Sequence, residues 1–178
     1  NAEDWSSFKE KGIASIGWEE LGDLSRFESQ DALKKAFDDF ESKWGANNSN
    51  SIKACWDFAH RIEEGDWIVA KQGMNKLIGV GEVTGEYIYQ GPDSEFSNMV
   101  AVNWWSGVEP FEISPESTKL PMKTLTEVTK SQAAVRNWVD SLHPELAPPF
   151  DKIFGSREGA EQFFDIARYT CECLGVTS

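Results

Sequence analysis

Two β-rich runs joined by a short loop restrict the possible folds of this chain more than any other feature. Residues 67–71 read Trp-Ile-Val-Ala-Lys, and residues 77–89 form a longer run of β-forming residues broken by glycines. Residues 72–76 between them suit a hairpin loop. Glycine inside a strand favours a bulge or a tight corner, so glycines at 79, 81 and 85 predict a strongly bent sheet or a barrel.

The order of the other elements makes the fold class α+β. Hydrophobic spacing predicts strands near 12–18, 99–105 and 111–113, and helices near 29–44, 52–62, 131–142 and 156–174. These elements do not alternate as a doubly wound fold requires, so we expect a mostly antiparallel, bent sheet or open barrel flanked by helices. The prolines at 144, 148 and 149 mark a boundary. They predict one domain over 1–145 and a helical extension or linker over 146–178.

The net charge indicates how the chain can bind nucleic acid, and the cysteine content indicates its cellular compartment. The 178 residues carry a formal net charge of −13, although residues 117–139 hold four bases against one acid. Contact with nucleic acid should therefore be weak and sensitive to salt. Three cysteines without framework spacing predict a reducing, cytoplasmic setting. No apolar run reaches the length of a membrane helix, so we expect no membrane partner.

Motifs for catalysis are missing from the sequence. It holds no G-x-x-x-x-G-K-[ST] loop and no G-x-S-x-G elbow, and the closely spaced glycines lie within a predicted strand rather than before a helix. Cys55 and His60 are five residues apart on one predicted helix, which separates their side chains. Cys171 and Cys173 lack partners with metal-site spacing. We expect a non-catalytic domain without cofactor or metal.

Aromatic residues are unusually frequent, with eight tryptophans in the chain. Trp56 and Trp138 fall on apolar faces of predicted helices, where filling the core explains them. Other aromatics lie at strand ends and loop edges, where side chains can form a slot for a stacked base. Core packing and a protein interface remain alternatives for the same residues.

Several motifs, in order, resemble EVE domains, which belong to the PUA-like group and are related to YTH domains. They are the run Ile-Ala-Ser-Ile-Gly-Trp-Glu-Glu-Leu-Gly-Asp-Leu-Ser at 13–25, Trp-Asp-Phe-Ala-His-Arg-Ile at 56–62, the glycine-rich stretch 65–89, Val-Asn-Trp at 102–104 and Leu-Pro-Met-Lys-Thr-Leu-Thr at 120–126. The version is most similar to the N-terminal domains of McrB-type proteins, GTP-driven motors of modification-dependent restriction. Asn98, Met99 and Ala101 stand where such domains often carry basic residues.

The resemblance implies a bent β-barrel that binds double-stranded DNA and accepts a flipped, modified base in an aromatic cage. N6-methyladenine is the first candidate ligand. Oligomerisation would then depend on other domains of the motor protein. An RNA- or tRNA-binding PUA-like module and a protein-interaction domain with exposed tryptophans are the alternatives. The predicted base-binding residues are Trp18, Trp44, Tyr87, Trp104, Asp23, Asn50 and Ser51, and the predicted backbone-binding residues are Lys71, Gln72, Gly73, Lys76, Lys119 and Lys123.

Overall fold

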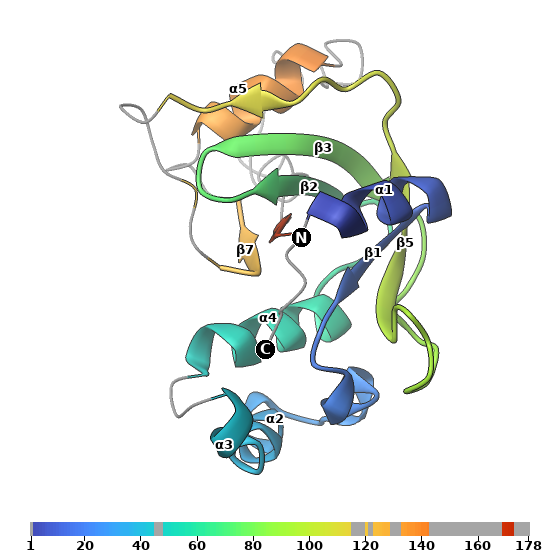
Figure 1. The fold of residues 1–178 in the computed structure, drawn as a ribbon, viewed down its shortest axis with the longest axis vertical. Helices are drawn as coiled ribbons and strands as arrows, with labels where there is room; N and C mark the ends of the chain where they lie inside the picture. Colours follow the sequence, from blue (N-terminus) through green and yellow to red (C-terminus); the bar gives the residue numbers. More distant parts are fainter. Residues whose placement is uncertain are drawn as a thin grey trace, which may run out of the picture.

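The computed structural model describes residues 2–44, 48–114, 120, 123–128, 133–142 and 169–172. It confirms the α+β class, with helices at both ends of a curved, mostly antiparallel sheet (Figure 1). The elements in chain order are α1 (Ala2–Lys11), β1 (Ile13–Ile16), the 3-10 turns η1 (Glu19–Leu21) and η2 (Leu24–Arg26), α2 (Gln30–Asp38), α3 (Glu41–Trp44), α4 (Ser49–His60), β2 (Trp67–Gln72), β3 (Lys76–Val83), β4 (Ile88–Tyr89), β5 (Asn98–Trp104), β6 (Phe111–Glu112), β7 (Leu125–Glu127), α5 (Ala133–Leu142) and β8 (Tyr169–Glu172).

The long strands lie in the middle of the sheet. The strand order is β1-β5-β3-β2-β8-β7, with β4 paired to β5 and β6 paired to β3. The pairing of β2 with β8 is parallel, and the other pairings are antiparallel. The predicted hairpin is confirmed as β2–β3, with residues 73–75 in the turn.

β3 contains a bulge and two glycines that allow close approach by its neighbours, as the sequence predicts. The register of β2 with β3 shifts between Ala70 and Lys71, which places a bulge opposite them. A Cβ on Gly79 would lie 2.2 Å from the indole of Trp5, and a Cβ on Gly81 would lie 2.8 Å from the backbone oxygen of Asn103. Both positions therefore need glycine for close approach, one to a side chain of α1 and the other to β5.

The predicted continuous strand over 77–89 is wrong after Val83. Thr84 donates its backbone N–H to Ala101 of β5, and the chain then turns through Gly85 and Glu86 into β4. β4 pairs with the beginning of β5, Ile88 opposite Met99. Both β3 and β4 thus pair with β5, with residues 84–87 between them.

The predicted C-terminal helix over 156–174 is wrong at 169–172, which form β8. This segment pairs with β2 on one side and β7 on the other. Its Tyr-Thr-Cys sequence suits a strand, and β2 offers it an otherwise open row of backbone groups. The rest of the predicted helix lies outside the described residues, and the division at 145/146 stays a prediction.

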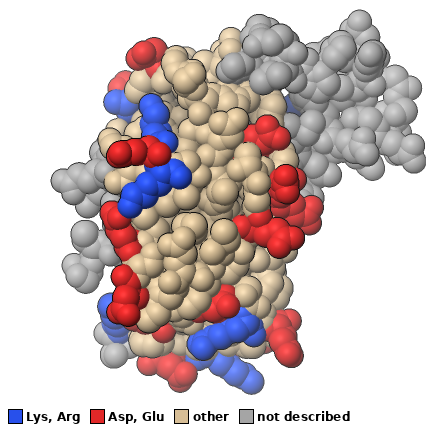
Figure 2. Space-filling model, turned by 90° about the vertical axis from the view of Figure 1, so that its right-hand side faces the viewer, with Lys and Arg blue, Asp and Glu red and all other residues tan. Residues whose placement is uncertain are grey.

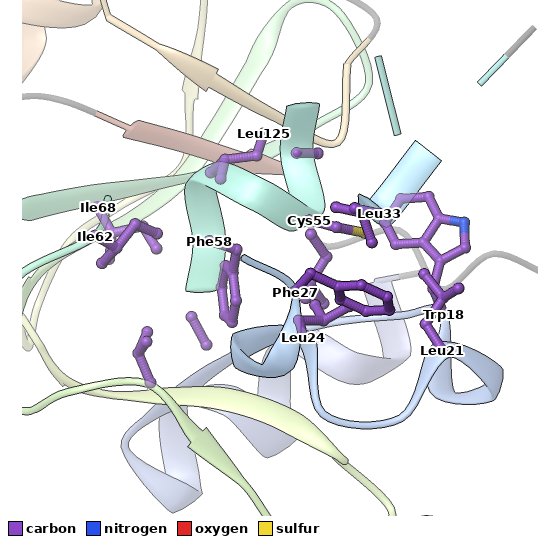
Figure 3. Packing of buried hydrophobic residues seen from close by; sticks show 14 of the residues in the cluster. Trp18, Leu21, Leu24, Phe27, Leu33, Cys55, Phe58, Ile62, Ile68 and Leu125 are labelled. Carbon is purple, nitrogen blue, oxygen red and sulfur yellow. The ribbon is translucent and has the colours of Figure 1, made fainter. Parts of the chain in front are cut away.

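Helices α2, α3 and α4 gather at one end of the molecule, and α5 lies at the other (Figure 1). Ser29 caps α2 by accepting a hydrogen bond from the backbone N–H of Ala32. The predicted helix 29–44 divides at Asp39 and Phe40 into α2 and α3. Buried faces of α2 and α4 meet β1 and β5 in one hydrophobic cluster, part of which is drawn in Figure 3. A second cluster lies under α5, and a third joins α1 to the sheet.

Candidate functional site

The segment 17–26, between β1 and α2, contains several predicted site residues and is tightly constrained. Trp18 adopts φ 67° and ψ 46°, and among the described residues it is the only non-glycine residue with positive φ. This left-handed conformation costs energy in a bulky residue, and such strain is found disproportionately at functional positions. Asp23 caps η2 by accepting hydrogen bonds from the backbone N–H and the hydroxyl of Ser25, at 2.9 and 2.7 Å.

An aromatic group connects this segment to α2 and α3. The ring of Trp18 meets the ring of Phe37 at 6.0 Å, and Phe37 contacts Trp44 at 5.1 Å. Phe40 supports Trp44 from a further side, at 4.7 Å. Trp18 is only 7% exposed and lies at one end of the core cluster beside Leu33 (Figure 3), so protein covers both faces of its indole. Trp44 is half-buried and keeps part of its surface open to solvent.

Tyr87 is fastened to the same segment through its hydroxyl group. The hydroxyl accepts a hydrogen bond from the backbone N–H of Leu24 at 2.9 Å and donates one to Oδ1 of Asn98 at 2.5 Å. Burial, and to a lesser extent the charge of Asp23, raises the pKa of the Tyr87 hydroxyl well above its ordinary value. The group therefore stays protonated and keeps donating to Asn98 over the whole physiological range.

Trp104 lies away from the other predicted base-binding aromatics. The segment 17–26 leaves the sheet where Ile16 pairs with Asn98, at the beginning of β5, whereas Trp104 ends β5 six residues later. At about 3.3 Å per residue the backbones of Asn98 and Trp104 are roughly 20 Å apart along the strand. The Trp104 indole donates to the backbone oxygen of Ile13 and packs edge-on against Trp5 at 4.7 Å. The structure thus brings Trp18, Trp44, Tyr87 and Asp23 around one segment and leaves Trp104 out.

Asn50 and Ser51 lie in the first turn of α4, close in sequence to Trp44. Asn50 is exposed and Ser51 is half-buried. The backbone of Asn48 begins α4, and its side chain makes no capping hydrogen bond. Residues 45–47, which connect α3 to α4, lie outside the described residues. These two polar side chains therefore lie at least partly at the surface of the first turn of α4.

The predicted backbone-binding residues are not a continuous basic surface. Lys71 is fully buried in β2, where its ammonium contacts the backbone oxygen of Gly73 at 3.5 Å, so it is not available to a phosphate. Gln72 and Lys76 are half-buried, and Gly73 forms the turn with φ 64°. Lys123 is exposed, and Lys119 lies outside the described residues.

Many of the basic side chains in the described part of the chain have acidic partners. Lys34 pairs with Asp38 at 2.8 Å, and Lys11 pairs with Glu95 at 2.5 Å. Further ion pairs join Lys43 to Glu20, Lys53 to Asp57, and Arg61 to Asp57 and Glu127. Figure 2 shows basic and acidic residues side by side along the edges of one face, with a broad uncharged area between them. A phosphate approaching this face meets no concentrated positive charge.

A cavity of about 670 Å³ lies between the end of α4 and the connection from β3 to β4. Tyr87 forms one wall, so the cavity adjoins the hydrogen bonds to Leu24 and Asn98. The carboxylates in its lining repel a phosphate backbone. The cavity therefore suits a different ligand from the one proposed for Trp44. The residues that line it are Ser25, Ala59, His60, Ile62, Glu63, Glu64, Glu86 and Tyr87.

Sequence reasoning missed Asn98 and the aromatic supports of Trp44. Asn98, Val100 and Val102 all point inward from β5. A polar residue among inward-facing apolar ones is the sequence signal that could have identified Asn98. Phe37 and Phe40 fit an apolar helix face, and only the three-dimensional arrangement brings them under Trp44. Within the described residues, no group of His, Cys, Asp and Glu has metal-site geometry. Nor is any helix in the described ranges sufficiently long and apolar to cross a membrane.

One of three comparisons with known proteins identifies a family, and none of them gives an activity. A search of the curated proteins and a search of the solved structures each found no match. Residues 1–129 match the model of the family described as "Domain of unknown function (DUF8426)". That match extends from α1 to just beyond β7 and includes the segment 17–26, the aromatic group and Tyr87. The chain therefore belongs to the DUF8426 family.

Proposed function

We propose that this domain is a non-catalytic nucleic-acid-binding module that recognises a modified base by stacking it on Trp44. The observation that carries the proposal is the state of that indole: Phe37 and Phe40 hold it in place, and part of it remains open to solvent. A rigid, partly exposed indole gives a base a surface worth about 1–3 kcal/mol of stacking. Asn50 and Ser51, in the first turn of α4, are the polar groups that we assign to the edge of the base.

The finer assignments belong to the same proposal. Similarity to EVE domains suggests a PUA-like barrel, double-stranded DNA with a flipped base as the ligand, and N6-methyladenine as the first base to test. The ordered motifs from 13–25 to 120–126 support this assignment. On the same resemblance, we propose that the domain targets a McrB-like restriction motor to DNA.

Ion pairs on the described surface reduce the number of phosphate contacts that we expect. Because Lys43, Lys53 and other bases are paired with carboxylates, few phosphate contacts are available on the described surface. Each phosphate contact adds about 0.9 to the slope of log affinity against log salt for B-DNA. We therefore expect weak binding with few phosphate contacts and a smaller salt dependence than the sequence alone predicts.

Binding of labelled 12-base-pair duplexes to the full chain tests the proposal. The duplexes should share one sequence and carry adenine, N6-methyladenine, 5-methylcytosine or 5-hydroxymethylcytosine at one position. We expect preference for one modification and a loss of about tenfold or more in affinity in Trp44→Ala. Trp105→Ala is the matched control, since Trp105 is also half-buried but packs on the α5 side of the sheet. Equal affinity of Trp44→Ala and the parent for every duplex would disprove the stacking role.

A protein-binding role is the second candidate, and the acidic cavity favours it. Glu63, Glu64 and Glu86 line that cavity, which suits a basic segment of a partner better than a nucleic acid. Matched RNA oligonucleotides and a lysine-rich peptide in the same titration separate the alternatives. Binding of the peptide but of no oligonucleotide would favour the protein-binding role.

A further inference from the structure

The side-chain amide of Asn98 is an unusual feature of the described core. Asn98 is fully buried, and Nδ2 is the only buried side-chain polar atom in the described part of the chain without a hydrogen-bond partner. Proteins rarely leave a buried donor unsatisfied, because its desolvation is then uncompensated. An amide in this state needs an acceptor from outside the chain.

Neighbouring hydrogen bonds determine which way the amide points. The backbone N–H of Leu24 can only donate, so the Tyr87 hydroxyl accepts there and directs its own proton elsewhere. That proton goes to Oδ1 of Asn98. This series of donors favours the orientation with Oδ1 toward Tyr87 and Nδ2 away from it. Tyr87 is thus a positioning residue for the Asn98 amide.

The amide faces the part of the sheet from which the segment 17–26 emerges. Asn98 pairs with Ile16 of β1 and with Tyr89 of β4, and cross-strand partners share one face of a sheet. A Cβ on Gly17 would meet no atom within 4 Å, and one on Gly22 would meet only the Tyr89 hydroxyl, at 3.7 Å. Gly17 and Gly22 therefore leave space at two points of a segment whose Trp18, Leu21 and Leu24 side chains are buried in the core.

The same segment also borders the Trp44 surface. Trp18 contacts Phe37, which supports Trp44, and Glu20 pairs with Lys43, the residue before Trp44. The strained backbone of Trp18 lies between these two groups. A shift of this one segment would change both the surroundings of Trp44 and the cover over Asn98.

We propose that Asn98 determines base specificity, with Nδ2 donating a hydrogen bond to a ring nitrogen or carbonyl oxygen on the edge of the flipped base. The inference rests on the proposed function and adds the atom that selects the ligand. The segment 17–26 shifts to admit the base, and its strain at Trp18 makes it the element poised to move. Discrimination follows because a base without an acceptor at that position leaves Nδ2 unsatisfied.

The test removes acceptors from the ligand one at a time. Duplexes carry N6-methyladenine or its 1-deaza, 3-deaza or 7-deaza analogue, each of which replaces one ring nitrogen by C–H. If N6-methyladenine is the preferred base, we expect one analogue to bind the unmodified protein about tenfold more weakly. If another modification is preferred, the corresponding analogues of that base are used. Equal affinity for all analogues overturns the proposal without any protein variant.

Protein variants then assign the donor. In Asn98→Asp the donor is removed while an oxygen stays available to Tyr87, so the sensitive analogue and the parent base should bind equally. Tyr87→Phe releases the Asn98 amide and should therefore reduce the discrimination between the parent base and the sensitive analogue. This variant adds no buried charge, so it remains usable if Asn98→Asp does not fold. Asn103→Asp is the matched control, because Asn103 is exposed near the other end of β5 and the substitution adds the same charge.

The outcomes separate the two proposals. Discrimination that persists unchanged in both Asn98→Asp and Tyr87→Phe overturns the role of Asn98, and a trapped water then satisfies Nδ2. If Trp44→Ala still abolishes binding in that case, the proposed function stands without this inference. If the unmodified protein binds no duplex at all, both proposals fail.

Discussion

The contact between Gly79 and Trp5 allows a quantitative test of how α1 is held on the sheet. A Cβ added to Gly79 would lie 2.2 and 2.3 Å from two carbons of the Trp5 ring, far inside contact distance. The backbone of Gly79 has no positive φ, so the clash is the main cost of alanine there. Gly79→Ala must therefore displace the indole from β3.

The cost of that displacement follows from the burial of Trp5. Complete loss of a buried tryptophan costs about 3–5 kcal/mol, and Trp5 is half-buried with one edge-on contact to Trp104. We expect Gly79→Ala and Trp5→Ala each to lower the free energy of unfolding by about 2 kcal/mol. In the Trp5→Ala background the new methyl group has room. Alanine then gains about 0.5–1 kcal/mol over glycine in a strand.

The double-mutant cycle consists of the parent, Gly79→Ala, Trp5→Ala and the variant with both substitutions. Urea unfolding of these four proteins, followed by far-UV circular dichroism, gives the coupling energy between the two positions. We expect about 2 kcal/mol or more, because the two single effects describe one lost contact. Gly85→Ala is the control, since its Cβ would be 3.7 Å from Ala101, an ordinary contact. If Gly79→Ala costs the same with and without Trp5, the close approach of α1 to β3 is not as described.

Two further predictions concern the segment 17–26 and its ion pair. Trp18→Ala should lower the free energy of unfolding by about 3 kcal/mol, because the indole is 7% exposed; chemical denaturation with no change in midpoint would contradict its place in the core. A hydrogen bond from Lys43 lowers the pKa of the Glu20 carboxyl, so its stabilising effect is present above the ordinary carboxyl pKa and is lost as the pH falls through the lowered one. The difference in urea midpoint between the parent and Glu20→Gln should therefore shrink from pH 7 toward pH 3, whereas a constant difference would refute the ion pair.

Local patterns predicted the parts of the fold that depend on neighbours in sequence. The β2–β3 hairpin has a loop of suitable length between two β-forming runs, and α4 has apolar residues at helical spacing. Glycines 79 and 81 signalled close approach correctly, although the sequence could not tell that Trp5 occupies the space at one of them. Periodicity shows which face of an element is buried but not which residues cover it.

The candidate site depended on such distant relationships and was harder to predict. Trp18 follows a strand, which suggested an exposed slot, but its left-handed backbone turns the side chain into the core against Phe37. Trp104 shares a strand with Asn98, yet the length of that strand places it at the far end. Local spacing predicts a helix at β8, because the partners that make it a strand, β2 and β7, lie more than 40 residues before it in the sequence.

The lengths of the strands have a consequence for self-association. β1 and β7, at the two ends of the strand order, have four and three residues, whereas β2, β3 and β5 inside have six, eight and seven. Open strand edges can pair with other chains and seed aggregation, and very short edge strands reduce this risk. By placing its long strands inside, the described sheet ends in short strands on both sides. The partly exposed Trp44 can therefore stay open to a ligand with little risk that the sheet extends into a fibre.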